Sequence, residues 1–190
     1  MSHRLLFTLL TASMLVASCA DDFAPKPRGY NRIELLPKNY HTFDSTCHFR
    51  FEIPGYAAIL PYDGPDARPC WLNVYFPYYN ATLHLSYSPV ASENTLYKLV
   101  EDSRRLVYKH TIKADEIIEN YIERPGKSGI VYELTGGTAT ALQFYMTDSS
   151  AHFLRGSLYF NTRTNPDSVA PVLQYLTDDV EHLIATLRWK

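Results

Sequence analysis

Four polar residues that lie close together in the sequence have the side-chain types that a hydrolase uses: Asp148, Ser149, Ser150 and His152. A catalytic serine needs a base and an orienting carboxylate that converge on it from separate elements, and no Gly-x-Ser-x-Gly turn surrounds these serines. Asp-Ser-Ser is also a common turn composition. The sequence therefore predicts a turn between two strands here, and it predicts no catalytic residues.

Histidine is a frequent ligand of transition metals, and the chain carries it at scattered positions. Most metal sites use short spacings of two to four residues between ligands, and these histidines lack them. The residues concerned are His41, His48, His84, His110, His152 and His182. A meeting of His48 and His84 with Trp71 on one sheet face is the alternative, but cross-strand aromatic packing explains such a face as well. We expect no metal and no cofactor.

A thiol at Cys19 offers another kind of chemistry. Residues 5–16 are mostly apolar, Arg4 precedes them, and two small residues stand directly before the cysteine. This is the layout of a bacterial lipoprotein signal, in which the thiol receives diacylglycerol and the cysteine becomes the N-terminus after cleavage. About twelve apolar residues are too few to cross a bilayer core of roughly 30 Å as a helix. We therefore expect removal of residues 1–18 and lipidation of Cys19, with an ordinary secretory signal as the alternative.

The rest of the chain divides into a short linker and one domain. Residues 19–41 are rich in proline and charge, which predicts an extended tether, although a first strand at 30–35 is the alternative. Residues 42–190 suffice for a single domain with a sizeable core. The whole chain has 18 Lys and Arg against 20 Asp and Glu, so it has no excess of positive charge with which to bind nucleic acid.

Two further cysteines, Cys47 and Cys70, remain once Cys19 is assigned to lipid. An even number of remaining cysteines in a protein exported from the cytoplasm suggests a disulfide. Each cysteine begins a run in which alternate residues are apolar, which places both thiols on the core-facing side of a strand. A bridge is therefore geometrically possible, and two buried free thiols are the alternative.

The pattern of apolar residues predicts strands and two helices. Ser92 is a suitable N-cap for a helix at 92–109, and an apolar stripe from Val169 to Leu187 predicts a second helix. The segment 111–122 is ambiguous between helix and strand. Strand-like runs lie at 47–53, 56–61, 70–77, 82–87, 129–135, 139–147 and 153–161. This order predicts an α+β fold in which an antiparallel sheet is covered by helices.

Several strings of residues occur together in a specific order: PKPRGYNR at 25–32, PCWLNVYFP at 69–77, EDSR at 101–104, YKHTIKAD at 108–115, HFLRGSLYFN at 152–161 and the terminal LRWK. Through these strings the chain resembles the gliding motility lipoprotein family GldD of the Bacteroidetes. By looser analogy, the closing strands and long helix are similar to the PsbP/Mog1-type sandwich.

The resemblance implies a membrane-anchored lipoprotein of the bacterial cell envelope that faces the periplasm. It also implies that the protein supports the assembly or stability of the gliding and type IX secretion machinery through contacts with other envelope proteins. The family has no established catalytic residues to carry over, so the resemblance favours a protein that is not an enzyme.

The densest charged stretch is EDSRR at 101–105, and Arg155 interrupts an apolar strand. Arginine can make bidentate bonds with partner carboxylates, so both places are candidate docking surfaces. A solvated helix face with ion pairs is the alternative for the first, and a pair with Asp102 or Asp115 is the alternative for the second. The candidate partner-binding residues are Arg104, Arg105, Lys109, His110 and Arg155.

Aromatic residues suggest a function of another class. The chain has 15 Tyr and 9 Phe, whose rings cover large areas. If exposed together, such rings would stack on sugars or other small ligands. The candidate residues of this ligand-binding face are Trp71, Tyr75, Tyr78 and Tyr79.

Overall fold

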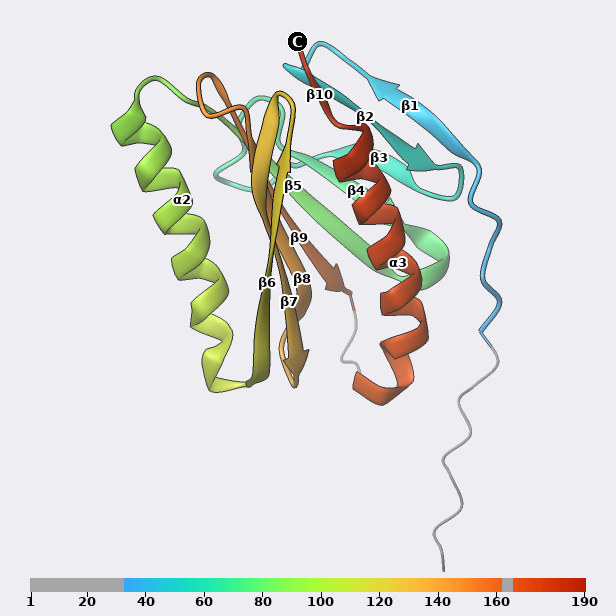
Figure 1. Cartoon of the computed structure of the whole chain (residues 1–190). Helices are drawn as coiled ribbons and strands as arrows, with labels where there is room; N and C mark the ends of the chain where they lie inside the picture. Colours follow the sequence, from blue (N-terminus) through green and yellow to red (C-terminus); the bar gives the residue numbers. More distant parts are fainter. Residues whose placement is uncertain (1–32, 162–165) are drawn as a thin grey trace, which may run out of the picture. The chain divides into compact units, whose positions relative to one another are not determined.

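The computed structural model describes residues 33–161 and 166–190, which form two antiparallel sheets and two long helices (Figure 1). Cys19 and the predicted signal at 1–18 lie outside the described residues, as does most of the predicted tether at 19–41. The order of strands and helices is that of a mixed α+β protein, as the sequence predicts.

The larger sheet has seven strands in the order β3-β4-β5-β9-β8-β7-β6. Their bounds are Ala58–Pro61 (β3), Leu72–Phe76 (β4), Ala81–Pro89 (β5), Ala114–Arg124 (β6), Lys127–Gly136 (β7), Thr140–Thr147 (β8) and His152–Phe160 (β9). Pairing of β5 with β9 joins the two groups of strands that the sequence predicts separately. The ambiguous segment 111–122 lies mainly in β6, an edge strand that is exposed along most of its length and therefore shows little apolar alternation.

A small second sheet contains β1 (Tyr40–Asp44), β2 (Phe49–Pro54) and the short β10 (Arg188–Trp189). The single sheet that the sequence predicts is therefore wrong for β2, which pairs with β1 and β10 and not with β3, the strand that follows it. Pro54 lacks an N–H and ends the strand, and the Ala57 N–H donates to its carbonyl in a turn (2.9 Å). Alternation sets which face of β2 is buried, but it does not select the partner strand.

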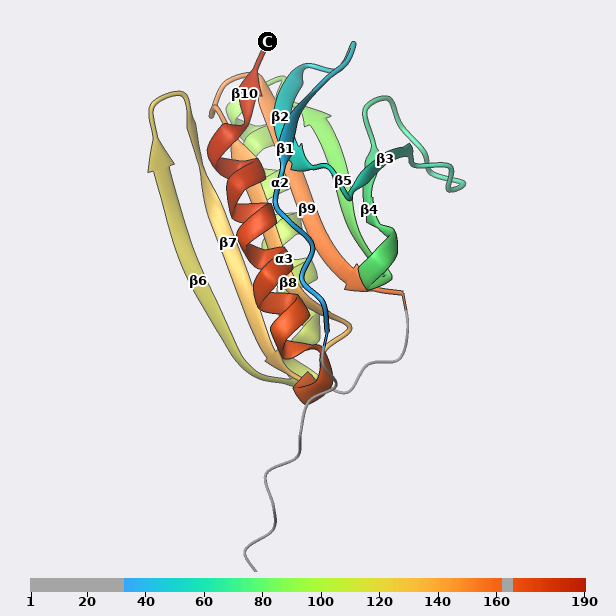
Figure 2. The same ribbon diagram turned by 90° about the vertical axis from the view of Figure 1, so that its right-hand side faces the viewer.

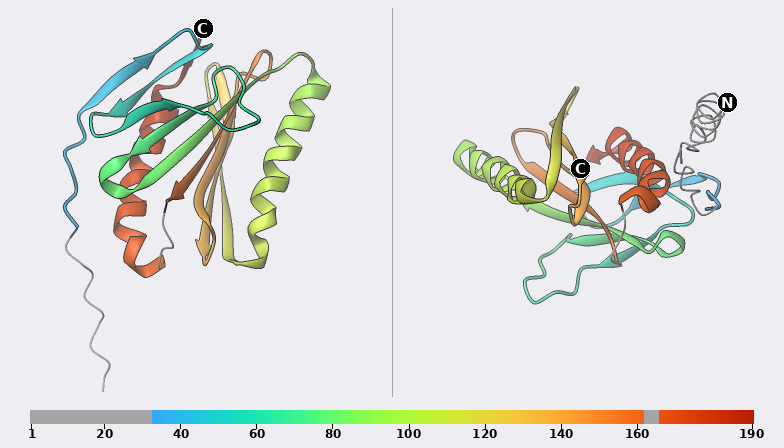
Figure 3. Two further views of the ribbon diagram at one scale, coloured as in Figure 1. Left: turned by 180° about the vertical axis from the view of Figure 1, so that it is seen from behind. Right: turned by 90° about the horizontal axis from the view of Figure 1, so that it is seen from below.

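The two helices cover opposite faces of the large sheet (Figures 1, 2 and 3). Helix α2 (Glu93–Tyr108) begins after Ser92, whose hydroxyl accepts a bond from the Thr95 N–H (3.2 Å), so the predicted N-cap is confirmed. Helix α3 (Pro166–Thr186) lies with the small sheet on the other face. The main core between the sheets and α3 includes Phe49, Phe51, Leu83, Phe144, Leu154 and Leu176, and a second cluster under α2 includes Val107, Tyr132 and Phe153.

The folded part of the chain begins before residue 42, where the sequence places the end of the tether. Leu36 packs against the core, and its N–H donates to the Tyr79 hydroxyl (2.9 Å). The Tyr175 hydroxyl of α3 donates to the Leu36 carbonyl, and Lys38 Nζ donates to the Tyr175 carbonyl (2.8 Å). These residues are extended, as their composition predicts, but they are docked along α3 rather than free.

The end of α3 is held by a buried lysine from β7. Lys127 is 6% exposed, and its Nζ donates to the carbonyls of Ile184, Ala185 and Leu187 at 2.6, 2.7 and 3.0 Å. Burial lowers the pKa of Lys127 to about 8, and the nearby Arg188 and Arg124 act in the same direction. The bonds satisfy carbonyls that have no partner within the helix and fix β10 beyond it.

Candidate functional site

The residues that resemble a hydrolytic triad form a turn between β8 and β9. Asp148 Oδ1 accepts bonds from the backbone N–H groups of Ser150, Ala151 and His152 at 3.0, 2.9 and 2.9 Å. The His152 ring instead faces Tyr87, with 2.9 Å between His152 Nδ1 and the Tyr87 hydroxyl. The carboxylate therefore shapes the turn, and the imidazole is directed away from the serines.

This turn gives a testable pH dependence. Burial alone raises the pKa of Asp148, but the bonds from Ala151, His152 and Ser150 outweigh it and lower the pKa from 3.8 to about 2. The contribution of the carboxylate is therefore present above about pH 4 and is lost as the pH falls toward 2. We expect Asp148→Asn to cost about 1 kcal/mol at pH 7.

Urea unfolding at several pH values between 7 and 2 tests this expectation. The difference in unfolding free energy between wild type and Asp148→Asn should shrink as the pH falls from 4 to 2. A difference that stays constant across this range would contradict the role of the ionised carboxylate.

The histidines do not gather around a shared ligand position. Within residues 33–161 and 166–190, no three His, Cys, Asp or Glu side chains lie close enough to hold a metal ion. His84 Nδ1 pairs with Asn73 Oδ1 (2.7 Å), and His182 Nε2 pairs with Glu52 Oε2 (2.7 Å). These pairs give both histidines structural partners.

Cys47 and Cys70 form a disulfide in the structure, with 5.6 Å between their Cα atoms. Cys47 is buried directly before β2, whereas Cys70 lies in the loop before β4 with a φ of 63°. The bridge ties the small sheet to the 62–71 loop of the large sheet. It therefore fixes the loop that carries Arg68 and Trp71, and each of these residues lines a surface cavity.

The five candidate partner-binding residues are not all on one surface. Arg104 is exposed on α2, with its guanidinium 5.4 Å from the centre of the Tyr108 ring. Arg105 pairs with Asp102 (2.7 Å) as an exposed ion pair, which contributes little stability. Lys109 is exposed at the end of α2, and His110 next to it is half-buried.

Arg155, the fifth candidate, lies on β9 and pairs with neither Asp102 nor Asp115. One of its guanidinium nitrogens donates to Gln143 Oε1 (2.7 Å). Burial lowers the pKa of Arg155 from its ordinary value. An arginine guanidinium nevertheless remains protonated in proteins. The ion pair that the sequence offers as an alternative is therefore not formed.

Large side chains are exposed in the segment that joins α2 to β6 and further along β6 itself. Ile112 is 91% exposed and Tyr121 is 75% exposed. The hydroxyls of Tyr108 and Tyr121 donate to the two oxygens of Glu119 at 2.9 and 2.8 Å. Figure 1 shows this region beside the edge strand β6, where the sheet has no further neighbour among the described strands. We call Arg104, Tyr108, Ile112, Glu119 and Tyr121 the α2–β6 surface.

The four aromatic residues proposed as a ligand-binding face do not share a face. Tyr79 is 8% exposed and packs in the main core against Tyr56 and Tyr175. Tyr78 is exposed in the short turn after β4. Trp71 lies on the other side of the sheet and lines a cavity there. A single stacking platform made of all four rings is therefore wrong, because the turn at 77–79 directs its neighbouring rings differently.

The face of the large sheet beside α2 is partly uncovered and polar. One row across three strands runs from Asn73 through His84 to Ser157, and Arg155 lies opposite Ser86 in the next row. These residues line a cavity of about 430 Å³, called here the Arg155 cavity. Its remaining lining residues are Tyr62, Asp66, Trp71, Leu85 and Tyr159.

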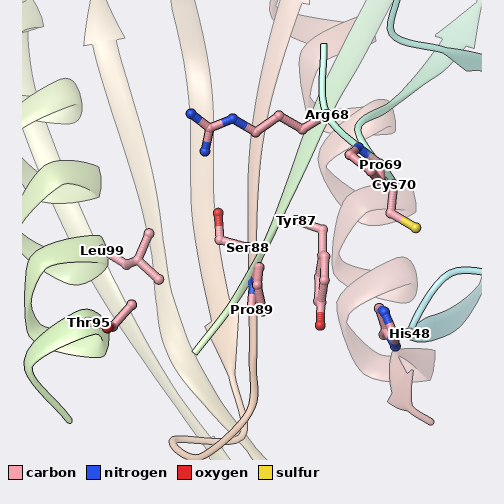
Figure 4. A pocket seen from close by; sticks show the side chains of 9 residues that line it. All are labelled: His48, Arg68, Pro69, Cys70, Tyr87, Ser88, Pro89, Thr95 and Leu99. Atoms are coloured by element: carbon pink, nitrogen blue, oxygen red, sulfur yellow. The ribbon is translucent and has the colours of Figure 1, made fainter. Parts of the chain in front are cut away.

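A second cavity of about 520 Å³ lies further along β5, and we call it the α2 cavity. Figure 4 shows Thr95 and Leu99 of α2 on one side and Tyr87, Ser88 and Pro89 of β5 beside them. The other lining residues are His48, Arg68, Pro69 and Cys70. The two cavities adjoin where the Arg68 guanidinium lies 5.5 Å from the centre of the Trp71 ring.

Several functional candidates are missing from the sequence-based prediction. Ile112, Glu119 and Tyr121 lie in the segment of ambiguous structure, so the exposure of Ile112 and Tyr121 and the bonds of Glu119 to Tyr108 and Tyr121 could not be foreseen. Arg68 lies in a loop without a motif. The register of β5 with β9 brings His84 opposite Ser157. This neighbourhood depends on the pairing of two strands that are distant in the sequence, so the sequence alone does not predict it.

Comparison with known proteins places these features in a family. A family model described as gliding motility lipoprotein GldD matches residues 20–189. No protein among the curated ones matches significantly. Within the described parts of the chain, no helix has both the length and the apolar character needed to cross a membrane.

Among solved structures, the solution structure of cyanobacterial PsbP from Synechocystis sp. PCC 6803 is similar in fold. It has 13% sequence identity and a TM-score of 0.50, and the match covers 84% of this chain and 98% of that one. The chain thus has a PsbP-like α+β fold, as expected. Because the family model spans nearly its whole length, the chain belongs to the gliding motility lipoprotein family GldD.

Proposed function

We propose that the protein is held on an envelope membrane by lipid on Cys19, faces the periplasm, and acts through protein contacts rather than catalysis. In this proposal it supports the assembly or stability of the gliding and type IX secretion machinery. Membership of the gliding motility lipoprotein family supports the setting. The observation that carries the mode of action is the exposed α2–β6 surface.

The α2–β6 surface combines features of a protein-binding site. Ile112 and Tyr121 expose most of their apolar area, which is costly to leave in water, and burial would be favourable by roughly 25 cal/mol per Å². Tyrosine and arginine are enriched among residues that dominate binding energy. Arg104 and Glu119 supply charges of both signs at the edge of the apolar residues. A partner that fits this surface therefore presents an apolar patch surrounded by both acidic and basic side chains.

The tyrosine rings of this surface are already held in place before any partner binds. Glu119 accepts bonds from both Tyr108 and Tyr121, and the Arg104 guanidinium lies over the Tyr108 ring. Rings that are fixed in advance lose less conformational entropy on binding. The arrangement therefore supports docking of a folded partner on this side of the molecule.

Co-purification tests the proposal. A C-terminally tagged protein should recover other gliding or secretion components from detergent-solubilised native membranes. The double variant Ile112→Asp, Tyr121→Ala should reduce this recovery at least about tenfold, because it removes the apolar contact and buries a charge. Tyr78→Ala, which removes an exposed ring from the turn after β4, should leave recovery unchanged.

A Cys19→Ala variant separates anchoring from docking. It should lose membrane association while its α2–β6 surface stays intact. Equal recovery of partners by wild type and by the Ile112→Asp, Tyr121→Ala variant would contradict docking on this surface.

The alternative function, a ligand-binding lipoprotein that uses Trp71, Tyr75, Tyr78 and Tyr79 together, has less support. The burial of Tyr79 in the core removes one ring from the proposed face. The uncovered sheet face around Trp71 is a different site, because most of its other lining residues come from β5 and β9.

A further inference from the structure

We propose that the Arg155 cavity binds a sugar that carries a carboxylate. The site lies on the uncovered part of the sheet, on the opposite side of α2 from the α2–β6 surface. Thr95 and Leu99 line the adjoining α2 cavity and so mark the side of α2 that faces both cavities. Arg104 and Tyr108 are about half a helical turn away from them around the helix axis. A ligand in the cavity and a protein on the α2–β6 surface can therefore be bound independently.

Arg155 provides the site for an anion. Its single hydrogen bond within the described residues is to Gln143 Oε1, and it has no carboxylate partner there. A guanidinium has five N–H donors in a planar fork, so most of them are free to bind a ligand. A planar carboxylate matches this fork with two parallel bonds.

The residues around Arg155 carry little negative charge to compete with such a ligand. Arg68 lies over the Trp71 ring where the two cavities adjoin, and it also has no carboxylate partner in the described part of the chain. Asp66 is the single acidic side chain that lines either cavity, and the Tyr62 hydroxyl donates to it (2.9 Å). The groove is thus locally basic in a chain whose formal net charge is −2.

His84 favours a hydroxyl over a second anionic group. Its Nδ1 lies 2.7 Å from Asn73 Oδ1, which can only accept, so this nitrogen carries the proton and Nε2 is an acceptor. Burial lowers the pKa of His84, which favours the neutral ring. A neutral imidazole acceptor, together with Asp66 and Ser157, suits the hydroxyl groups of a sugar.

Aromatic rings complete the lining. Trp71 is partly exposed, and the Tyr159 ring meets His84 edge-on at 5.5 Å. Rings of this kind offer an apolar face to the C–H groups of a sugar ring while polar neighbours bind its hydroxyls. A volume of about 430 Å³ is within the range of small-molecule sites. A carboxylated sugar therefore satisfies the charge, the polar groups and the rings at once.

Galacturonate and galactose give a matched pair of probes, because they differ only in the carboxylate. The experiment uses the full chain in detergent, and every sample carries Trp189→Phe. The sequence has two tryptophans, so Trp71 is then the single one that remains. We expect galacturonate to change the Trp71 emission and to bind at least about tenfold more tightly than galactose by calorimetry. Acetate and inorganic phosphate should bind more weakly than galacturonate.

Variants assign the binding to Arg155. Arg155→Gln should weaken galacturonate at least about tenfold while leaving the weak binding of galactose unchanged, and Arg155→Lys should fall between the two because it keeps charge but not the fork. Arg50→Gln, at an exposed position on β2 of the small sheet, should bind like the parent. Thermal melting confirms that each variant is folded.

Three results would overturn the inference: no binding of galacturonate, equal affinity for galactose, or phosphate or acetate binding as tightly as galacturonate. Unchanged affinity in folded Arg155→Gln would also overturn it. None of these results depends on the capture of envelope partners, so the proposed function can stand or fall separately.

Discussion

Replacing Asp179 by alanine is expected to destabilise the protein by about 3–5 kcal/mol, the largest effect of a single change that the structure indicates. Asp179 is 2% exposed on α3, and three groups from the N-terminal part of the fold converge on it. Tyr40 donates to Oδ1 (2.8 Å), Tyr56 donates to Oδ2, and Lys38 Nζ lies 3.3 Å from Oδ1. Alanine would leave the half-buried Tyr40 and Tyr56 hydroxyls without this acceptor. It would also remove one of the acceptors of Lys38, which keeps the Tyr175 carbonyl and Asp178.

The tyrosines stay protonated donors in this arrangement. Burial, followed by the bond to Asp179, raises the pKa of both Tyr40 and Tyr56 well above the usual value for tyrosine. Both phenols therefore remain donors to the Asp179 side chain. The cluster of Lys38, Tyr40, Tyr56 and Asp179 fastens β1 and the 38–56 region to α3.

Asp178 is the matched control for this prediction. It is the next residue of α3 and also pairs with Lys38 (3.1 Å), but its side chain is 54% exposed. Asp178→Ala should therefore cost less than about 1 kcal/mol. Urea unfolding of both variants tests the contrast, and a similar loss of stability in the two would contradict the assigned role of Asp179.

Loss of the disulfide is expected to lower the unfolding free energy by about 3 kcal/mol. The bridge closes a loop with a sequence separation of 23 residues, and it restrains the unfolded chain. For a protein of this size the loss corresponds to a fall in Tm of roughly 6–12 °C. The change to make is Cys47→Ser with Cys70→Ser, which avoids leaving a single thiol.

Reductant provides the internal control for the disulfide. Dithiothreitol should lower the Tm of the wild-type protein close to that of the double variant and should leave the double variant unchanged. A wild-type Tm that is insensitive to reductant under conditions that reduce the bridge would contradict the prediction. Because the bridge holds the 62–71 loop, reduction should also weaken galacturonate binding if Trp71 and Arg68 contribute to it.

Local sequence patterns predicted the elements better than their partners. Alternation of apolar residues located β2, β4, β5, β7, β8 and β9, and the Ser92 cap located the start of α2, because these signals depend on near neighbours in the chain. The pairing of β2 with β10 depends on a contact across most of the chain. The bonds of Lys127 to the end of α3 also join distant parts of the chain. The sequence gives no sign of them, because a lysine in a strand ordinarily points to solvent.

The same limit applies to the candidate sites. Arg155 stands out in the sequence as a charge within an apolar strand. Its surroundings come from the preceding strand β8 and also from β4 and β5, which are distant in the chain. Tyr79 is adjacent to the exposed Tyr78, and composition gives no sign that only one of them is buried. Burial of adjacent aromatic residues is decided by the turn at 77–79, so it follows from the tertiary structure.

We propose that this lipoprotein acts through docking on its α2–β6 surface. The most direct test complements a native strain that lacks the gene with wild type, Tyr78→Ala, or the Ile112→Asp, Tyr121→Ala variant, while immunoblots confirm equal membrane levels. We predict that wild type and Tyr78→Ala restore gliding or secretion and that the α2–β6 variant does not. Full restoration by the α2–β6 variant at wild-type levels would contradict the claim.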